Sequence, residues 1–256
     1  MTIRNGIIVL LLAVVVGVGG WYVFTHTQSL PHVLTENGDR LIKEDTDYYT
    51  VQVVYPNTTR LSTRTDSSKQ ADDRAVAAIE ADMKDTVSLF KNNANKALTT
   101  EEKARLAEQK VKYSLNIGNH AYNSGSFVSY EFDLFEDTGG AHPINAYKTL
   151  VFDLKGNQVK LGDLFTSNEY LNRIAAEAKK QVEAQLTSRT GGEDAASALV
   201  ADGVAAREEN FSNWVDNEGV LTIFIPPYQA AAYAAGSFEV RIPLQDLKDI
   251  LKPGIQ

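Results

Sequence analysis

The sequence predicts an α+β fold in which helices pack on antiparallel sheets. Two segments, 68–92 and 168–188, carry apolar residues at spacings of three and four, which is typical of amphipathic helices. Other segments alternate polar and apolar residues and are rich in β-branched and aromatic side chains, as strands are. Because helices interrupt runs of strands instead of alternating with them singly, the order favours α+β over a repeated βαβ unit.

The first residues predict a membrane anchor. Residues 7–24 carry no charge, and at about 1.5 Å per residue they would form a helix of roughly 27 Å, close to the hydrocarbon thickness of a bilayer. Arg4 precedes this segment and no A-x-A-like cleavage site follows it, which favours a transmembrane signal anchor at 6–24 over a cleaved signal peptide. We therefore expect a single-pass protein of the bacterial cytoplasmic membrane, with residues 1–5 in the cytoplasm and the C-terminal part outside.

The remaining elements are expected in a simple order along the chain. Residues 25–46 are polar and show no clear period, so they are interpreted as a linker. A strand at 48–56 and the first helix follow, and then Thr99 with Glu102 forms a capping-box pattern for a second, short helix. Further strands are expected at 111–122, 126–137, 146–154, 210–216, 220–227 and 237–244, and a last helix at 245–252.

The strand at 126–137 contains four acidic residues close together, Glu131, Asp133, Glu136 and Asp137. Val128, Tyr130, Phe132 and Leu134 share one apolar face, while Glu131 and Asp133 point to the other. Two carboxylates on one strand could serve general acid and base chemistry, but acidic residues on a strand more often lie on a solvated face. We expect Glu131 and Asp133 to be solvated.

Composition excludes several classes of function. The chain has no cysteine, which excludes disulfides, thiolate metal sites and cysteine nucleophiles. It carries 33 acidic and 25 basic residues, a net charge of −8, which disfavours nucleic acid and anionic lipid headgroups and favours a cationic partner. We find no P-loop, G-x-G-x-x-G, G-x-S-x-G or H-E-x-x-H motif, and we predict no metal and no cofactor.

The segment "DTGGAHP", residues 137–143, is the strongest candidate for a site. His142 could bind a metal together with Asp137 or His120, or act as a general base with a carboxylate. The alternative is a structural turn, in which Gly139 and Gly140 adopt positive φ and the proline holds His142 extended. A loop of this kind can also present backbone N–H groups to a ligand, and residue chemistry favours binding or structure over catalysis.

Two tyrosines near the end of the chain form the second candidate. Tyr228 and Tyr233 lie in "IPPYQAAAYAAG", after two prolines. Aromatic rings on loops supply contact area for sugars or proteins at low entropic cost. The alternative is that both rings pack a turn against the sheet, and we expect Trp214 to lie in the core.

The loop and the closing segment together resemble a known family. "TGGAHP" followed by "INAYKTLVFDLKGNQVKLGDLF" is similar to the extracellular domain of RsiV-type anti-sigma factors, and "ENFSNWVDNEGVLTIFIPPYQAAAYAAGSFEVRIPLQDLKDIL" is similar to the closing segment of that domain. The same two-part domain precedes the catalytic domain of PdaC-type peptidoglycan deacetylases. The resemblance covers about residues 47–252 and divides the chain into a PdaC-like half, 47–135, and an RsiV-like half, 136–256. The residues that match the family pattern are Thr138, Gly139, Gly140, Ala141, His142, Tyr228, Tyr233 and Gly236.

The resemblance implies a binding module. RsiV-type domains bind lysozyme, and the catalytic residues of the deacetylases lie in a different domain, so no catalytic residue carries over. Because only five residues are expected in the cytoplasm, we expect no anti-sigma activity. We expect an extracytoplasmic envelope domain that recognises a lysozyme-like protein or peptidoglycan. The alternatives are a glycan-modifying enzyme that uses His142 and a carboxylate, and a structural envelope protein without a small ligand. The candidate binding residues are Thr138, Gly139, Gly140, His142, Tyr228 and Tyr233.

Overall fold

The computed structural model describes residues 33–59, 61, 66–191 and 198–255. The expected cytoplasmic tail and the anchor at 6–24 lie outside these residues, as does the first part of the expected linker. Among the residues described, no helix combines the length and the apolarity that a membrane span needs.

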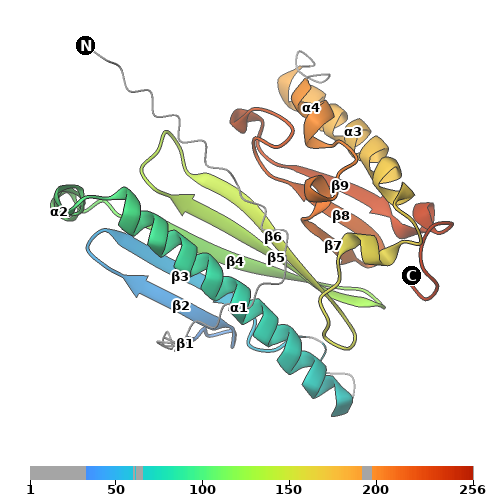
Figure 1. The fold of residues 1–256 in the computed structure, drawn as a ribbon, viewed down its shortest axis with the longest axis horizontal. Helices are drawn as coiled ribbons and strands as arrows, with labels where there is room; N and C mark the ends of the chain where they lie inside the picture. The colour runs from blue at the N-terminus through green and yellow to red at the C-terminus, as the bar shows by residue number, and fades with distance from the viewer. Residues whose placement is uncertain (1–32, 60, 62–65, 192–197, 256) are drawn as a thin grey trace.

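The N-terminal part of the fold is a six-stranded sheet whose strands follow the order of the chain (Figure 1). Strands β3 and β4 run parallel, because helices α1 and α2 connect them, and all other neighbouring strands are antiparallel. The sheet is therefore mixed, where the sequence predicted antiparallel pairing. The elements are β1 (Val33–Leu34), β2 (Arg40–Asp45), β3 (Tyr49–Tyr55), α1 (Asp66–Ala97), α2 (Thr100–Gln109), β4 (Tyr113–Asn123), β5 (Phe127–Asp137) and β6 (Ile144–Asp153).

Helix α1 covers one face of this sheet and forms the first core with it (Figure 1). Its apolar positions, predicted from the helical period, are fully buried, as Ile79, Met83 and Phe90 show. They pack against every second residue of the central strands, including Val51 and Ile117. The predicted capping box of α2 is confirmed, since Thr99 Oγ1 accepts from the Glu102 N–H and Glu102 accepts from the Thr99 N–H.

The C-terminal part is a three-stranded antiparallel sheet covered by α3 (Figure 1). The buried stripe of α3 includes Ile174, Ala178 and Val182, three of the apolar positions predicted for this helix. Trp214 is buried, as predicted. The elements are α3 (Glu169–Thr190), α4 (Ala198–Gly203), β7 (Trp214–Asn217), β8 (Val220–Ile225) and β9 (Phe238–Pro243).

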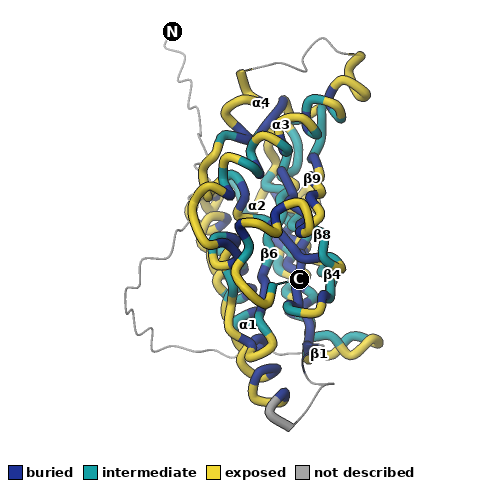
Figure 2. Tube along the Cα trace, turned by 90° about the vertical axis from the view of Figure 1, so that its right-hand side faces the viewer, coloured by how far each residue is buried: buried dark blue, intermediate teal, exposed yellow. Residues whose placement is uncertain are grey.

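The two sheets dock where β7 crosses the face of β5 and β6 that α1 leaves open. The N–H of Trp214 donates to Thr149 Oγ1 at 2.9 Å, and the Asp216 N–H donates to Ser129 Oγ at 3.2 Å. The ring of Trp214 meets that of Phe127 edge-on, with centroids 6.4 Å apart. In Figure 2, buried positions run through the middle of the molecule, and α1 and β4 lie on opposite sides. The two sheets therefore pack against each other, with one hydrophobic core beneath α1 and a second beneath α3.

Two features differ from the expected organisation. The interpretation of residues 25–46 as a linker is wrong for Val33–Leu34 and Arg40–Asp45, which form the paired strands β1 and β2 at the edge of the first sheet. Strand β2 is mostly polar because only one of its side chains, Ile42, is buried, so its composition resembles that of a linker. Strand β6 belongs to the first sheet, so the change from one sheet to the other falls after Asp153 and not at position 136.

The end of the chain also differs from the expectation. The predicted helix at 245–252 is a short 3-10 helix at Leu244–Leu247, followed by a turn. Its apolar residues are nevertheless buried, because Leu247 and Ile250 pack into the second core. The apolar spacing is thus satisfied by turns as well as by an α-helix.

Candidate functional site

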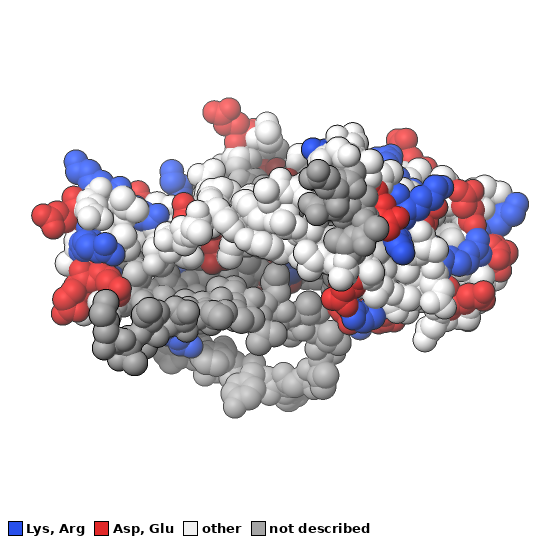
Figure 3. Space-filling view, turned by 90° about the horizontal axis from the view of Figure 1, so that it is seen from above, with Lys and Arg blue, Asp and Glu red and all other residues white. Residues whose placement is uncertain are grey.

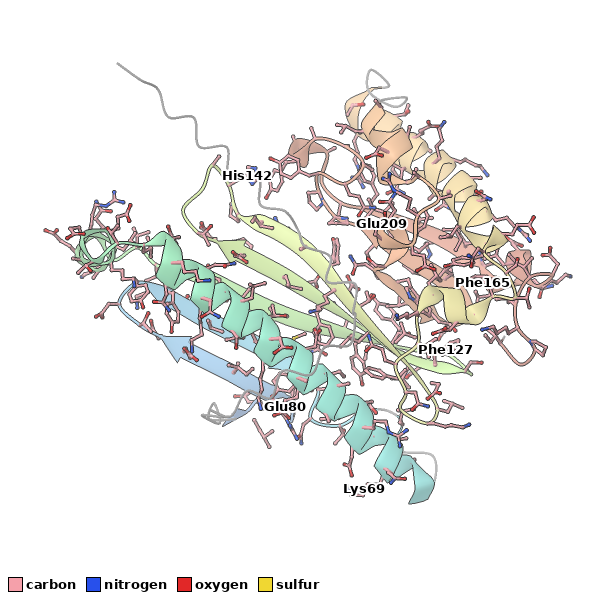
Figure 4. All side chains as sticks on the ribbon, viewed as in Figure 1. Lys69, Glu80, Phe127, His142, Phe165 and Glu209 are labelled. Atoms are coloured by element: carbon pink, nitrogen blue, oxygen red, sulfur yellow. The ribbon has the colours of Figure 1, made fainter. Side chains whose placement is uncertain are left out.

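The two candidate segments meet at one end of the molecule. The loop between β5 and β6 carries His142, and the connection between β8 and β9 carries Tyr228 and Tyr233. Figure 4 labels His142 at the tip of the long β5–β6 hairpin, beside this connection. We call His142, Tyr228 and Tyr233 the aromatic cluster.

Local turn chemistry positions the loop. The Gly139 N–H donates to Asp137 Oδ1 at 2.9 Å, which closes a turn directly after β5. Gly139 has φ of +72°, as the structural interpretation predicted, whereas Gly140 is not among the described glycines with positive φ. Both glycines are exposed and Thr138 is half-buried, so the predicted loop residues lie at the surface beside the aromatic cluster.

The β8–β9 connection, which carries the tyrosines, is fixed by contacts of Gln229 with α4 and the segment that follows it. Gln229 Nε2 donates to the carbonyl oxygens of Gly203 and Asn210, at 2.8 and 3.0 Å. A Cβ on Gly203 would lie 2.0 Å from the Gln229 carbonyl oxygen, so only glycine permits this close approach. Tyr228 adopts φ of +72°, a conformation that tyrosine rarely adopts. The fold therefore holds Tyr228 in an unfavourable backbone conformation and presents its ring at the surface.

A hydrogen-bond chain fixes the three side chains. His142 Nδ1 lies 2.9 Å from the Pro143 carbonyl oxygen, and His142 Nε2 lies 2.7 Å from Tyr228 Oη. Because a carbonyl oxygen can only accept a hydrogen bond, a neutral His142 carries its proton on Nδ1. Its Nε2 then accepts a hydrogen bond from the Tyr228 hydroxyl. The Tyr233 hydroxyl donates to the same Pro143 oxygen at 2.9 Å and accepts from Asn145 Nδ2, also at 2.9 Å.

The rings form a compact surface. The imidazole of His142 stacks on Tyr233 with centroids 3.7 Å apart and planes 17° apart, and Tyr228 lies 5.7 and 5.5 Å from the two rings. Tyr228 is 60% exposed, although its hydroxyl is engaged. An oriented, exposed aromatic ring offers a flat apolar face without further loss of side-chain entropy.

The two segments that carry the aromatic cluster contain no charged residue, although Arg189 of α3 donates to the carbonyl oxygens of Ala235 and Ser237 beside them. Residues 138–147 and 219–238 contain no Asp, Glu, Lys or Arg, in a chain with 58 such residues. Figure 3 views the molecule from above and shows mostly uncharged side chains over the middle, with charged ones gathered toward both ends. The three rings of the aromatic cluster thus offer stacking and hydrogen bonds to a ligand, and no ion pair.

The geometry does not suit catalysis at His142. Its two ring nitrogens contact the Pro143 carbonyl and the Tyr228 hydroxyl, so no carboxylate orients the imidazole as a general base. Asp137 binds the Gly139 N–H, and His120 forms an ion pair with Asp133 at 3.2 Å. Across the described part of the chain, no three His, Asp or Glu side chains gather closely enough to hold a metal.

The expectation of a solvated face is wrong for Glu131. This carboxylate is 5% exposed, because the second sheet docks on the strand face to which it points. Burial raises its pKa, although the Tyr122 hydroxyl, which donates to Oε2 at 2.6 Å, acts in the opposite direction. Burial and this carboxylate together raise the pKa of Tyr122. Asp133 lies nearer the open surface, with a side chain that is 49% exposed.

Sequence reasoning missed two members of the site. Pro143 supplies the carbonyl that joins His142 to Tyr233, and Asn145 orients the Tyr233 hydroxyl. A backbone carbonyl leaves no signal in the sequence. The exposed Asn145 in a strand, where asparagine is disfavoured, was a signal that could have been used.

The chain is similar to two protein families, each over part of its length. The family model described as Deacetylase PdaC matches residues 42–145, and the model described as Protein of unknown function (DUF3298) matches residues 162–245. Over 127 residues the chain is 29% identical to the peptidoglycan-N-acetylmuramic acid deacetylase PdaC of Bacillus subtilis (strain 168). The match covers 49% of this chain and 26% of that protein, so the chain spans only a part of the relative's length. The PdaC part of the resemblance is confirmed, and the RsiV-type part stays a prediction.

Two solved structures share the fold. A DUF3298 family member from Bacteroides fragilis superposes with a TM-score of 0.52 and 18% identity, over 84% of this chain and 92% of that one. A DUF3298 family protein from Pseudomonas aeruginosa PAO1 gives a TM-score of 0.52 and 15% identity, over 88% and 96% of the two chains. At this level of identity the likeness shows the arrangement of helices and sheets alone.

Proposed function

We propose that the chain is an extracytoplasmic binding module of the bacterial cell envelope, anchored by residues 6–24, that recognises cell-wall glycan at the aromatic cluster. The observation that carries this proposal is the exposed ring of Tyr228, which is held at positive φ and oriented by His142 in a segment without charged residues. A strained backbone conformation persists only where the surrounding structure enforces it, and such positions concentrate at ligand sites.

The chemistry of the surface fits a sugar. Pyranose rings have an apolar C–H face that packs on an aromatic ring, and their hydroxyls bond to groups such as the backbone N–H groups and amides of a glycine-rich loop. The relative in Bacillus subtilis is named as a deacetylase of peptidoglycan N-acetylmuramic acid, which supports an envelope role. The PdaC model extends to residue 145, so the matched residues include β5 and the loop with His142, but only the first two residues of β6.

A lysozyme-like protein is the second candidate ligand. The observation in its favour is the net charge of −8, because an acidic surface attracts a strongly basic protein and accelerates association. Such a partner would contact the charged ends of the molecule and not the uncharged aromatic cluster. The glycan-modifying enzyme that uses His142 has no comparable support, since no carboxylate contacts that imidazole.

Titration of the full chain in lipid nanodiscs distinguishes the two ligands. The probes are a neutral N-acetylglucosamine oligosaccharide and hen lysozyme, each at low and at physiological salt. Saturable binding of the oligosaccharide at both salt concentrations supports the glycan proposal. Binding of lysozyme alone, without any glycan, contradicts it and favours the protein ligand.

A further inference from the structure

A row of four uncharged, exposed side chains crosses the first sheet and ends at the aromatic cluster. Gln52 on β3 is the register partner of Asn116 on β4, Asn116 pairs with Phe135 on β5, and Phe135 pairs with Asn145 on β6. All four are exposed, and Phe135 is one of the exposed large apolar residues of the described chain, at 37%. We call these four residues the cross-strand row.

The cross-strand row lies on the face of the sheet that α1 does not cover. Val51, Val53, Leu115 and Ile117, the chain neighbours of Gln52 and Asn116, point into the core beneath α1. Because successive side chains of a strand alternate between faces, the cross-strand row points the opposite way. Figure 2 shows β4 on the side of the molecule away from α1. The second sheet docks farther along β5, at Phe127 and Ser129, and leaves the row open.

The composition of the cross-strand row is unusual for a solvated sheet face. Asparagine is disfavoured in strands, yet Asn116 and Asn145 flank the exposed phenyl ring directly on both sides. Within the described residues, the carboxamides of Gln52 and Asn116 form no hydrogen bond with the rest of the chain. Each can donate two hydrogen bonds and accept others, which matches the paired donor and acceptor character of sugar hydroxyls.

The row is continuous with the aromatic cluster. Asn145 Nδ2 donates to Tyr233 Oη at 2.9 Å, so the last member of the row is also a member of the site. Three steps between neighbouring strands, of about 4.8 Å each, give the row a length of roughly 14 Å. A ligand held at Tyr228 and Tyr233 can therefore extend across the sheet along this row.

Neighbouring charges indicate which glycan fits. Asp133 and Asp137 lie on the same face of β5 as Phe135, one on each side of it along the strand. At the other end of the row, the exposed Lys43 on β2 is the register partner of Gln52. The two carboxylates disfavour an anionic substituent on the sugar unit at Phe135, whereas the lysine accommodates one at the far end of the row.

Resting on the proposed function, we propose that the cross-strand row is an extended subsite for an N-acetylated glycan chain, in which Phe135 stacks on a sugar ring without an ionised substituent and the flanking carboxamides bind its hydroxyls. The aromatic cluster holds one part of the glycan, and the row holds the units that follow. Affinity therefore increases with chain length.

The test compares β-1,4-linked N-acetylglucosamine disaccharide and hexasaccharide by calorimetry, with the full chain in nanodiscs. The hexasaccharide is expected to bind the unaltered chain about tenfold more tightly than the disaccharide. Phe135→Ala and Asn116→Ala are expected to remove that gain and leave disaccharide binding unchanged. The matched controls are Leu89→Ala and Asn93→Ala, at exposed positions of α1, which should retain the gain.

Each outcome decides the proposal. A gain with chain length that disappears in both row variants, but not in the controls, supports it. Equal affinity for the two oligosaccharides, or a gain that survives Phe135→Ala, overturns the extended subsite and leaves the aromatic cluster as a glycan site. Absence of binding for both oligosaccharides overturns the extended subsite and the proposed function together.

Discussion

The imidazole of His142 lies flat on the ring of Tyr233, with 3.7 Å between the ring centroids, and both side chains bind the carbonyl oxygen of Pro143. This stack joins the loop of the first sheet to the β8–β9 connection of the second. The contact serves two purposes, because it closes the junction of the sheets and fixes the position of Tyr228. The same residues that looked like a structural turn and a pair of packing tyrosines thus form one surface.

Replacing Tyr228 tests whether its ring contributes to glycan binding or to the stability of the fold. Tyr228→Gly removes the exposed ring and the hydrogen bond to His142, which is worth about 1 kcal/mol, but relieves a positive φ that costs tyrosine a similar amount. We expect glycan binding to be lost while the free energy of unfolding changes by less than about 1 kcal/mol. Chemical denaturation and calorimetry on the same sample measure both quantities. A loss of several kcal/mol with retained binding would mean that Tyr228 is structural.

Gly203 supports the connection from beneath. Gly203→Ala places a methyl group 2.0 Å from the Gln229 carbonyl oxygen, so the connection must shift. We expect a loss of stability of about 1–3 kcal/mol, together with weaker glycan binding, since Tyr228 moves with Gln229. Gly125→Ala is the control, because its added methyl group would meet no atom within 4 Å. Unaltered affinity in a destabilised Gly203→Ala protein would place the site elsewhere.

The buried carboxylate of Asp216 makes stability depend on pH. Asp216 is 1% exposed, its Oδ1 accepts from the Gly219 N–H, and its Oδ2 has no partner among the described residues. Burial raises its pKa, so the folded state binds the proton more tightly than the unfolded state does. The stabilisation is present at acidic pH and is lost as the pH rises from about 4 through the raised pKa.

Asp216→Asn should therefore flatten the dependence of the unfolding free energy between pH 4 and 8. A residual slope is expected from Glu131 and Glu136, whose pKa values burial also raises. Urea titrations at several pH values measure the slope. An unchanged slope in Asp216→Asn would show that the fold does not raise the pKa of this carboxylate.

Salt should affect the two candidate ligands differently. The aromatic cluster is uncharged, so affinity for a neutral oligosaccharide is expected to change less than twofold between low and physiological salt. Lysozyme binding, if it occurs through the acidic surface, should weaken markedly over the same range, chiefly through slower association. Surface plasmon resonance at several salt concentrations reports both. Glycan binding that disappears at physiological salt would contradict recognition by the aromatic cluster.

Local patterns predicted most of the elements. The apolar spacing of α1 and α3 and the capping box at Thr99 depend on neighbours in the chain, and the structure confirms them. Strand β2 was missed because its pairing with β3, and not its own composition, stabilises it. The burial of Glu131 was missed for a related reason, since it depends on a sheet that lies far away in the sequence.

The site was predicted as separate parts. The glycine-histidine loop and the two tyrosines were candidates on composition alone, but their meeting depends on how two sheets dock. The cross-strand row was equally hidden, because Gln52, Asn116, Phe135 and Asn145 become neighbours only through the register of four strands. Register follows from the hydrophobic pattern of all strands together and cannot be obtained from one strand.

Hydrogen exchange of the full chain, with and without saturating N-acetylglucosamine hexasaccharide, tests most directly whether the aromatic cluster is the recognition site. We expect slower exchange in residues 138–147 and 226–237, and no change in α1, which covers the other face of the first sheet. Saturable binding with slower exchange only in α1 or other segments, and none in these two, would contradict this expectation.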